Sequence, residues 1–192
     1  MRFRRAFGAL VLASLALSGC TLVPTTSAPV LVNPHTVPFG LLGKTIPGTN
    51  HGQVRFITQP VYIVDATGHL TASSRIVPTP PSLASVLREL VLGPTDIEVR
   101  TGYSSALPKN LVILQAKVRK GIGYIAVADP LSSLPARQET LALGQMVFTA
   151  YDVGATNGIE ITVAGVAQPS LLPNGSTQTL VTVKNYNSLL NH

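Results

Sequence analysis

The sequence contains one cysteine and no tryptophan, and charged and aromatic residues are both scarce. A single thiol cannot form an intramolecular disulfide, so a disulfide-stapled fold is excluded. The four histidines are dispersed along the chain, and they offer no metal-ligand spacing. The chain has no glycine-rich phosphate loop and no basic stretch interleaved with aromatic residues. We therefore expect no metal site, no cofactor and no nucleic-acid partner.

The only cysteine, Cys20, stands behind the pattern of an export signal. A short basic segment precedes an uncharged run, Ala6–Leu17, which is followed by two small residues. A charged start, a short apolar run and small residues before a cleavage site are typical of a signal peptide. As a helix this run rises only about 18 Å, whereas the hydrocarbon core of a bilayer is about 30 Å thick. The run is therefore not a permanent membrane span, and residues 1–19 are predicted to be a signal peptide.

The residues Leu17-Ser18-Gly19-Cys20 resemble the bacterial lipobox. This resemblance implies that diacylglycerol modifies Cys20, which becomes the first mature residue and anchors a lipoprotein on the extracytoplasmic side of the cell membrane. The alternative is that Cys20 is only a small buried hydrophobe at the end of a signal peptide. Removal of residues 1–19 leaves eleven basic against eight acidic residues, a net charge of +3. This charge is compatible with a position near an anionic membrane or wall polymer.

Residues 20–55 are predicted to form the lipidated start of the mature chain and a tether. Five prolines punctuate a segment of small and β-branched residues with almost no charge. Prolines at this spacing prevent both a continuous helix and a central strand. At roughly 3 Å per residue, a semi-extended chain could hold a domain tens of ångströms from the bilayer. A linker without a binding role is the alternative, and the apolar Val37–Leu42 could pack back on the domain.

From Pro60 onward the sequence becomes periodic. The apolar run Val61–Val64, a turn cluster and the alternating segment His69–Val77 predict a β-hairpin. In its second strand the even-numbered residues from Leu70 onward lie on one side, and Thr71, Ser73 and Arg75 lie on the other.

A helix is predicted next, with Ser82 as its cap. Its apolar residues recur at i, i+3, i+4, i+7 and i+8 from Leu83 to Val91, which is typical of one buried helix face. Gly93-Pro94 is predicted to end it, because glycine adopts the left-handed closing conformation readily.

The second half of the chain repeats this scheme. Leu111–Lys117 and Gly123–Ala128 predict a second hairpin, joined at residues 119–121. A helix from residue 137 or 138 to Asp152 and a strand over Ile159–Val163 follow. The tail holds a turn at residues 172–175 and a candidate short strand at 179–183. The pattern predicts one small α+β domain, residues 56–192, with two helices packed on a mixed or antiparallel sheet in the order ββαββαβ.

Three blocks in order, Glu89–Thr95, Ser104–Pro108 and Gln145–Thr149, resemble the GerMN domain of the sporulation and spore germination family. The closing Leu172–Gly175 and Tyr186 also fit, so the resemblance covers about residues 60–190. It implies a fold similar to the ring-building motifs of secretion and sporulation assemblies. It implies no catalytic residues, because none is established for the family.

The residues themselves offer weak candidates for catalysis. Gly102–Ala106 is a near miss to a nucleophile elbow, because Ala106 stands where the second glycine belongs. Asp96 and Glu98 could form an acid pair, or they could be exposed loop carboxylates in a solvated turn beside Arg100.

Seven residues are candidates for interaction or for a structural motif. Gln145 and Thr149 lie one turn apart on an otherwise apolar helix. In the structural interpretation Thr149 bonds back to its own helix and Gln145 binds a backbone group of the 93–108 loop, and the alternative is a ligand site. Lys117, Arg119 and Lys120 cluster at a hairpin tip, either solvated or in contact with anionic lipid or wall polymer. The remaining two candidates are the aromatic residues Tyr103 and Tyr124.

The sequence therefore predicts a lipid-anchored, non-enzymatic envelope protein. Its expected work is interaction, by docking to another envelope protein, to itself or to a wall polymer. The alternative is a cryptic envelope hydrolase or carbohydrate-processing factor, which a cleft with convergent carboxylates would favour.

Overall fold

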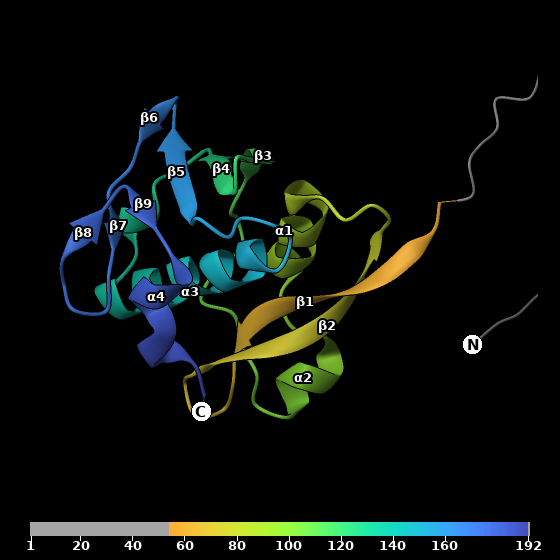
Figure 1. Ribbon diagram of the computed structural model, residues 1–192. Helices are drawn as coiled ribbons and strands as arrows, with labels where there is room; N and C mark the ends of the chain where they lie inside the picture. The colour runs from red at the N-terminus through yellow and green to blue at the C-terminus, as the bar shows by residue number, and fades with distance from the viewer. Residues whose placement is uncertain (1–53, 192) are drawn as a thin grey trace, which may run out of the picture. The chain divides into compact units, whose positions relative to one another are not determined.

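The structure is a computed structural model that describes residues 54–191, and it confirms the predicted α+β class (Figure 1). The predicted signal peptide, Cys20 and nearly all of the predicted tether lie outside the described residues. In chain order the elements are β1 (Phe56–Val64), β2 (Leu70–Pro78), α1 (Leu83–Leu92), α2 (Asp96–Arg100), β3 (Ile113–Arg119), β4 (Ile122–Val127), η2 (Leu131–Ser133), α3 (Ala136–Tyr151), β5 (Ile159–Val163), β6 (Val166–Ala167), β7 (Ser170–Leu171), β8 (Thr177–Gln178), β9 (Leu180–Val181), α4 (Val183–Tyr186) and η3 (Asn187–Leu189). None of the helices in this part of the chain has the length and apolarity to cross a bilayer.

The predicted first hairpin is present as β1 and β2, paired antiparallel along their full length. Its second strand alternates as predicted, and the structure shows which side is covered. Arg75 is 9% exposed and Val77 is fully buried, whereas Ile76 between them is 70% exposed. An arginine lies inside because a carboxylate of α2 meets it there. The ion pair with Glu98 therefore accompanies a charged residue on the covered side of this strand.

The first long helix, α1, begins and ends where the sequence predicts. The Ser82 side-chain oxygen accepts a hydrogen bond from the backbone N–H of Ser85, and the Ser85 side-chain oxygen accepts one from the backbone N–H of Ser82. Such a reciprocal cap satisfies two of the backbone donors that a helix start leaves open. The predicted apolar face is buried through Leu83, Val86, Leu87 and Leu90. The chain leaves the helix at Gly93.

The strands divide among three sheets. The largest has the order β3-β4-β5-β6, with β9 pairing along β5, and it combines antiparallel pairs with a parallel β4–β5 pair. The β3–β4 hairpin turns at Lys120 and Gly121, whose φ values of 51° and 75° match the tight turn that suits the right-handed twist of paired strands. The β1–β2 hairpin and the short β7–β8 pair form separate sheets.

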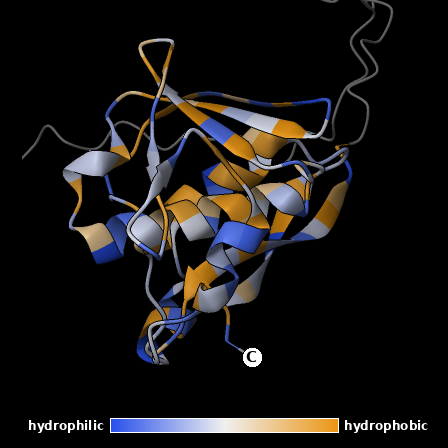
Figure 2. Ribbon diagram, turned by 60° about the vertical axis from the view of Figure 1, so that its left-hand side comes forward, coloured by the Kyte–Doolittle hydropathy of each residue, from blue (hydrophilic) through white to orange (hydrophobic). Residues whose placement is uncertain are grey.

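Helix α3 is the centre of the described fold. All its residues from Glu139 to Ala150 are buried, because β1, α1, β7 and α4 contact it from different sides. Hydrophobic residues gather around it in the middle of the ribbon (Figure 2). Gly144 lies at its tightest contact, where a Cβ atom would be 2.7 Å from Leu70 Cδ1 and 3.1 Å from Leu189 Cδ1. Any side chain there would force the ends of the Leu70 and Leu189 side chains to move aside.

Several short elements depart from the sequence prediction. The loop predicted around Asp96 and Glu98 is instead the five-residue helix α2, capped by the Thr95 side chain. The tail contains β7, β8, β9 and α4 rather than one strand at 179–183. Tyr186 in α4 is fully buried, and its hydroxyl donates to the Leu171 carbonyl at 2.9 Å. These elements were not predicted because they are too short to show a periodic pattern.

Candidate functional site: the outer face of the sheet

The candidate residues from the sequence lie in three separate places. Gln145 and Thr149 are fully buried on α3. Tyr103 lies in the loop after α2, half-buried against the core. Lys117, Arg119, Lys120 and Tyr124 share the outer face of the β3–β4 hairpin, where a hollow forms. Of these candidates, only the last group lines one of the four hollows found among the described residues.

Gln145 joins two segments that are far apart in the sequence. Its side-chain oxygen accepts a hydrogen bond from the Ala106 backbone N–H at 2.8 Å, which is the expected contact with the 93–108 loop. Its side-chain nitrogen donates to the Tyr62 carbonyl of β1, also at 2.8 Å. With both ends of the amide engaged by backbone groups, Gln145 serves as a structural bridge.

Thr149 makes a different bond from the one that the sequence analysis predicts. Its hydroxyl oxygen accepts from the backbone N–H of Tyr62 at 3.0 Å, so the predicted bond back to its own helix is wrong. Gln145 and Thr149 thus satisfy both backbone groups of Tyr62. A neighbouring strand would normally do this, and here two side chains one helical turn apart replace it.

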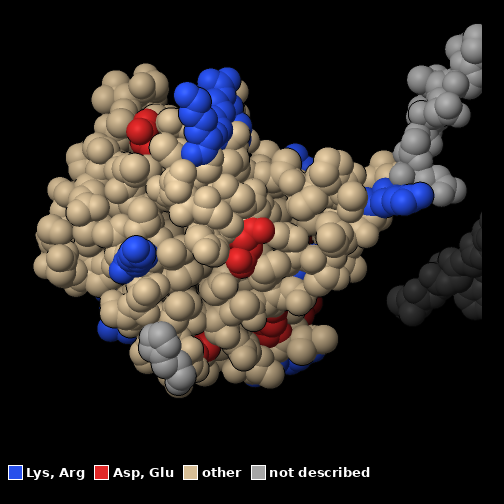
Figure 3. Space-filling model, in the orientation of Figure 1, with Lys and Arg blue, Asp and Glu red and all other residues tan. Residues whose placement is uncertain are grey.

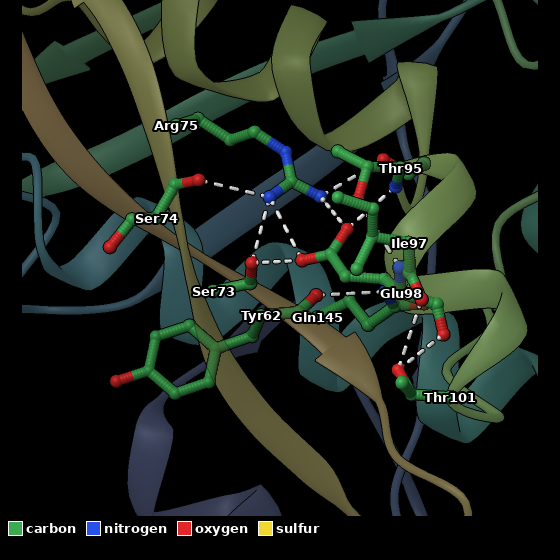
Figure 4. A network of polar contacts seen from close by, with 10 residues as sticks. Tyr62, Ser73, Ser74, Arg75, Thr95, Ile97, Glu98, Thr101 and Gln145 are labelled. Atoms are coloured by element: carbon green, nitrogen blue, oxygen red, sulfur yellow. Dashed lines mark hydrogen bonds and ion pairs between the residues drawn. The ribbon is translucent and has the colours of Figure 1, made fainter.

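A polar network fixes α2 against the first hairpin (Figure 4). Arg75 donates to both carboxylate oxygens of Glu98, at 3.1 Å and 2.8 Å, and to the Gly93 carbonyl at 3.1 Å. Partial burial would raise the pKa of Glu98, but hydrogen bonds from Arg75, Ser73 and Thr95 outweigh it and lower the pKa to about 2. The interpretation of Glu98 as an exposed loop carboxylate is therefore wrong, and no acid pair with Asp96 forms.

The near miss to a nucleophile elbow also has a structural explanation. Ser104 exchanges backbone hydrogen bonds with Val64, at 2.9 Å and 2.7 Å, so this loop is bound to the edge of β1. The Ser105 hydroxyl accepts from the Leu107 N–H at 3.2 Å and lies 3.4 Å from the Gln145 side-chain oxygen. Within residues 54–191, no three His, Cys, Asp or Glu side chains gather as metal ligands. Four hollows on the surface of the described residues have no carboxylate among their lining residues.

The outer face is built by strand register. In the β3–β4 hairpin Arg119 pairs with Ile122, Lys117 with Tyr124 and Gln115 with Ala126, so these side chains project on the same side. The intervening Ile125 and Val127 are fully buried on the opposite side, toward the core. The parallel pairing of β4 with β5 places Thr162 beside Ala126.

These rows surround a hollow of about 560 Å³. Its lining residues are Gln115, Lys117, Arg119, Lys120, Ile122, Tyr124, Ala126, Thr162 and Gly165. Arg119 and Lys120 are exposed, whereas Lys117 and Tyr124 are half-buried. Figure 3 shows Lys and Arg atoms gathered near the end of the sheet that carries β3 and β4.

The three cations of this hollow have no carboxylate partner among the described residues, in which Arg75–Glu98 is the only ion pair. Lys117 Nζ donates to the Gln115 side-chain oxygen at 3.0 Å. Glu160 is the register partner of Tyr124 across the parallel β4–β5 pair, but it makes no ion pair with the cations. The hollow therefore has a net positive charge with a tyrosine ring among the cations.

Sequence reasoning found the basic cluster but not the hollow. The predicted hairpin places Lys117, Arg119 and Lys120 together near its tip. The contributions of Thr162 and Gly165 depend on the parallel β4–β5 pairing, which brings together segments separated by the whole of α3. No local pattern shows that pairing.

Comparison with solved structures shows the class of fold. The described domain is similar to the tandem GerMN domains of the sporulation protein GerM from Bacillus subtilis, with 13% identity and a TM-score of 0.53, over 68% of this chain and 47% of that one. It is also similar to the first GerMN domain of that protein, with 16% identity and a TM-score of 0.51, over 67% of this chain and 98% of that one. The chain thus spans about half the length of the tandem structure. The fold is that of a GerMN domain.

The sequence places the chain in a family. Residues 60–169, more than half of the chain, match the family model described as "Germane: Sporulation and spore germination". The chain belongs to this family. A search of curated proteins found no match. Neither the family nor the solved relatives indicate a catalytic class.

Proposed function

We propose that this protein is a lipid-anchored envelope protein whose GerMN-like domain acts as a non-catalytic interaction module. The observation that carries the proposal is the hollow on the outer face of the sheet, where Tyr124 and three cations without carboxylate partners among the described residues line one concave surface. Charged side chains left without partners around a concave surface are available to a second molecule.

The polar residues of the interior support a non-catalytic role. Gln145, Thr149 and Arg75 all bind backbone groups or a structural carboxylate. Every buried side-chain nitrogen and oxygen among the described residues has a hydrogen-bond partner. A catalytic group needs a polar atom that points toward the substrate. The polar atoms of Gln145, Thr149 and Arg75 are instead engaged by backbone groups and by Glu98.

The sequence of the first twenty residues supports the anchor. A diacylglycerol on Cys20 would attach the mature chain to the membrane, and residues 21–53 would separate the anchor from the domain. We expect Cys20→Ala to stall processing or to release the protein from membranes. Fractionation of cells and gel mobility measure this. A Cys20→Ala variant that remains fully in the membrane fraction at mature size would contradict the anchor.

The interaction role is tested by crosslinking in intact cells. A photo-crosslinking amino acid at Tyr124 should give discrete products, whereas the same group at Tyr151, which is 43% exposed on α3, should not. Both sites are tyrosines, so the chemical change is matched. Identical products from both positions, or none from Tyr124, would show that the outer face is not the interacting surface.

A further inference from the structure

We propose that the hollow on the outer face binds a linear anionic polysaccharide, so that the domain holds a sugar polymer of the envelope that bears carboxylate or phosphate groups. This inference rests on the proposed function, because it names the partner class of the same face. Three properties of the hollow carry it: its charge, its shape and the position of Tyr124.

The charge selects an anion. Lys117, Arg119 and Lys120 bring three positive charges to one hollow, and none has a carboxylate partner within residues 54–191. The fork of an arginine matches a carboxylate or a phosphate through two parallel hydrogen bonds, and the two lysines add mobile point charges. Repulsion among the three cations is relieved when an anion lies between them.

The shape selects a chain rather than a single ion. From Ile122 to Ala126 the floor of the hollow follows β4 over roughly 13 Å, because the steps between these residues are about 3.3 Å each. The cations lie toward the turn of the β3–β4 hairpin, and Gly165 lies at the other end, in the turn that follows β5. An elongated surface of this kind supports successive units of a polymer.

Tyr124 lies in the middle row, opposite Lys117. The ring of a half-buried tyrosine presents an apolar surface and a hydroxyl, a combination suited to a sugar, which has an apolar face and hydroxyl edges. Gln115 and Thr162 add amide and hydroxyl groups on the same face. The ligand is therefore expected to combine rings, hydroxyls and negative charge.

A flat membrane surface fits this arrangement less well. Arg119 and Lys120 are exposed, but Lys117 and Tyr124 are half-buried within a concave site. A planar layer of headgroups would reach the exposed pair only. An apolar protein surface fits less well too, because exposed hydrophobic residues such as Ile76, Leu92 and Leu114 do not line the hollow.

The test measures binding of the full chain, purified in nonionic detergent, to sodium polygalacturonate, a linear carboxylated glycan. Dextran, polyglutamate, and vesicles of phosphatidylglycerol and phosphatidylcholine are the comparison probes. We expect binding to polygalacturonate that weakens as salt is raised, and weaker or no binding to the other three. Equal binding to dextran or polyglutamate would overturn the need for both sugar and charge, and preferential binding to the vesicles would favour a lipid surface.

Two sets of variants locate the binding. Lys117→Gln with Arg119→Gln should weaken polygalacturonate binding by roughly tenfold or more, because two charge-assisted contacts are lost. Arg55→Gln with Lys109→Gln removes the same charge from exposed positions outside the hollow and should change binding by less than about twofold. Tyr124→Ala should weaken binding by roughly tenfold, and Tyr124→Phe should retain most of it because the ring remains.

Chemical shifts of the unmodified chain provide a measurement that needs no variant. On addition of polygalacturonate, the shifts should change at the residues lining the hollow and not across α2. Shifts elsewhere, or equal losses in both double variants, would overturn the inference. If the polymer does not bind while crosslinking from Tyr124 still yields discrete products, the inference fails and the proposed interaction role stands.

Discussion

Gln145 provides the most direct test of how the core is organised. Replacement by methionine keeps the length and nearly the volume of the side chain but removes both polar ends. The Ala106 N–H would lose its partner in a buried position, and the Tyr62 carbonyl would lose its partner at a half-buried one. An unsatisfied buried polar group costs about 1–3 kcal/mol.

The two groups together would cost up to about 6 kcal/mol, and water reaching the half-buried Tyr62 carbonyl reduces this. We therefore expect Gln145→Met to lower the free energy of unfolding by about 2–4 kcal/mol. Urea denaturation followed by circular dichroism measures the change, with an unchanged dependence on denaturant concentration as the check that unfolding remains two-state.

Gln178→Met is the matched control, because Gln178 is an exposed residue of β8. It should change stability by less than about 0.5 kcal/mol. The reasoning would be refuted if Gln145→Met were as small as this control, because the backbone groups of Tyr62 and Ala106 would then not depend on the amide.

Two further predictions concern the first helix and the network of α2. Leu90→Ala should lower the free energy of unfolding by about 2–5 kcal/mol, because Leu90 is 1% exposed and its truncation leaves a cavity. Arg88→Ala, on the exposed side of the same helix, should lower it by less than about 0.5 kcal/mol. Equal melting temperatures for the two variants would contradict the assignment of the buried helix face. The pKa of Glu98 falls from 4.5 to about 2 on folding, so the unfolded chain binds a proton at this carboxylate more readily than the folded chain does. The contribution of ionised Glu98 to stability is therefore complete above about pH 4.5 and is lost as the pH falls toward 2. Glu98→Gln should therefore reduce the loss of melting temperature between pH 5 and pH 2. The comparison is made with the unmodified chain, because hydrogen bonds from Thr67 and His69 lower the pKa of Asp65 in the same direction and Asp65 contributes to the same acid profile. An unchanged acid profile would show that Glu98 does not contribute.

The elements predicted correctly are those whose signals are local. Helix α1 shows its cap, its apolar spacing and its closing glycine within twelve residues, and β5 stands between clear turns. Helix α2 was missed because five residues cannot show a periodic pattern, although Thr95 and Glu98 have the spacing of a capping box. That spacing was the one local sign of the helix.

The rest could not be predicted because it depends on distant segments. A threonine on a helix is expected to form a hydrogen bond with the backbone of its own helix. Thr149 instead accepts a hydrogen bond from Tyr62, which lies 87 residues earlier in the chain. Arg75 is inside because α2 supplies Glu98. The hollow needs β4 and β5 side by side, and these two strands are separated in the chain by the whole of α3.

The arrangement of the first hairpin has a mechanical consequence. The chain enters the domain at the open end of β1, where Phe56 is 63% exposed and pairs with Pro78 (Figure 1). A force applied through the preceding chain would separate the β1–β2 residue pairs one at a time, beginning with Phe56 and Pro78. The peeling would first meet the hydrogen bond from the Gln59 side chain to the Asp152 carbonyl and the buried Val61. It would then reach Tyr62, which α3 holds by both backbone groups. The outer part of the hairpin can thus yield under load while the core and the hollow keep their shape.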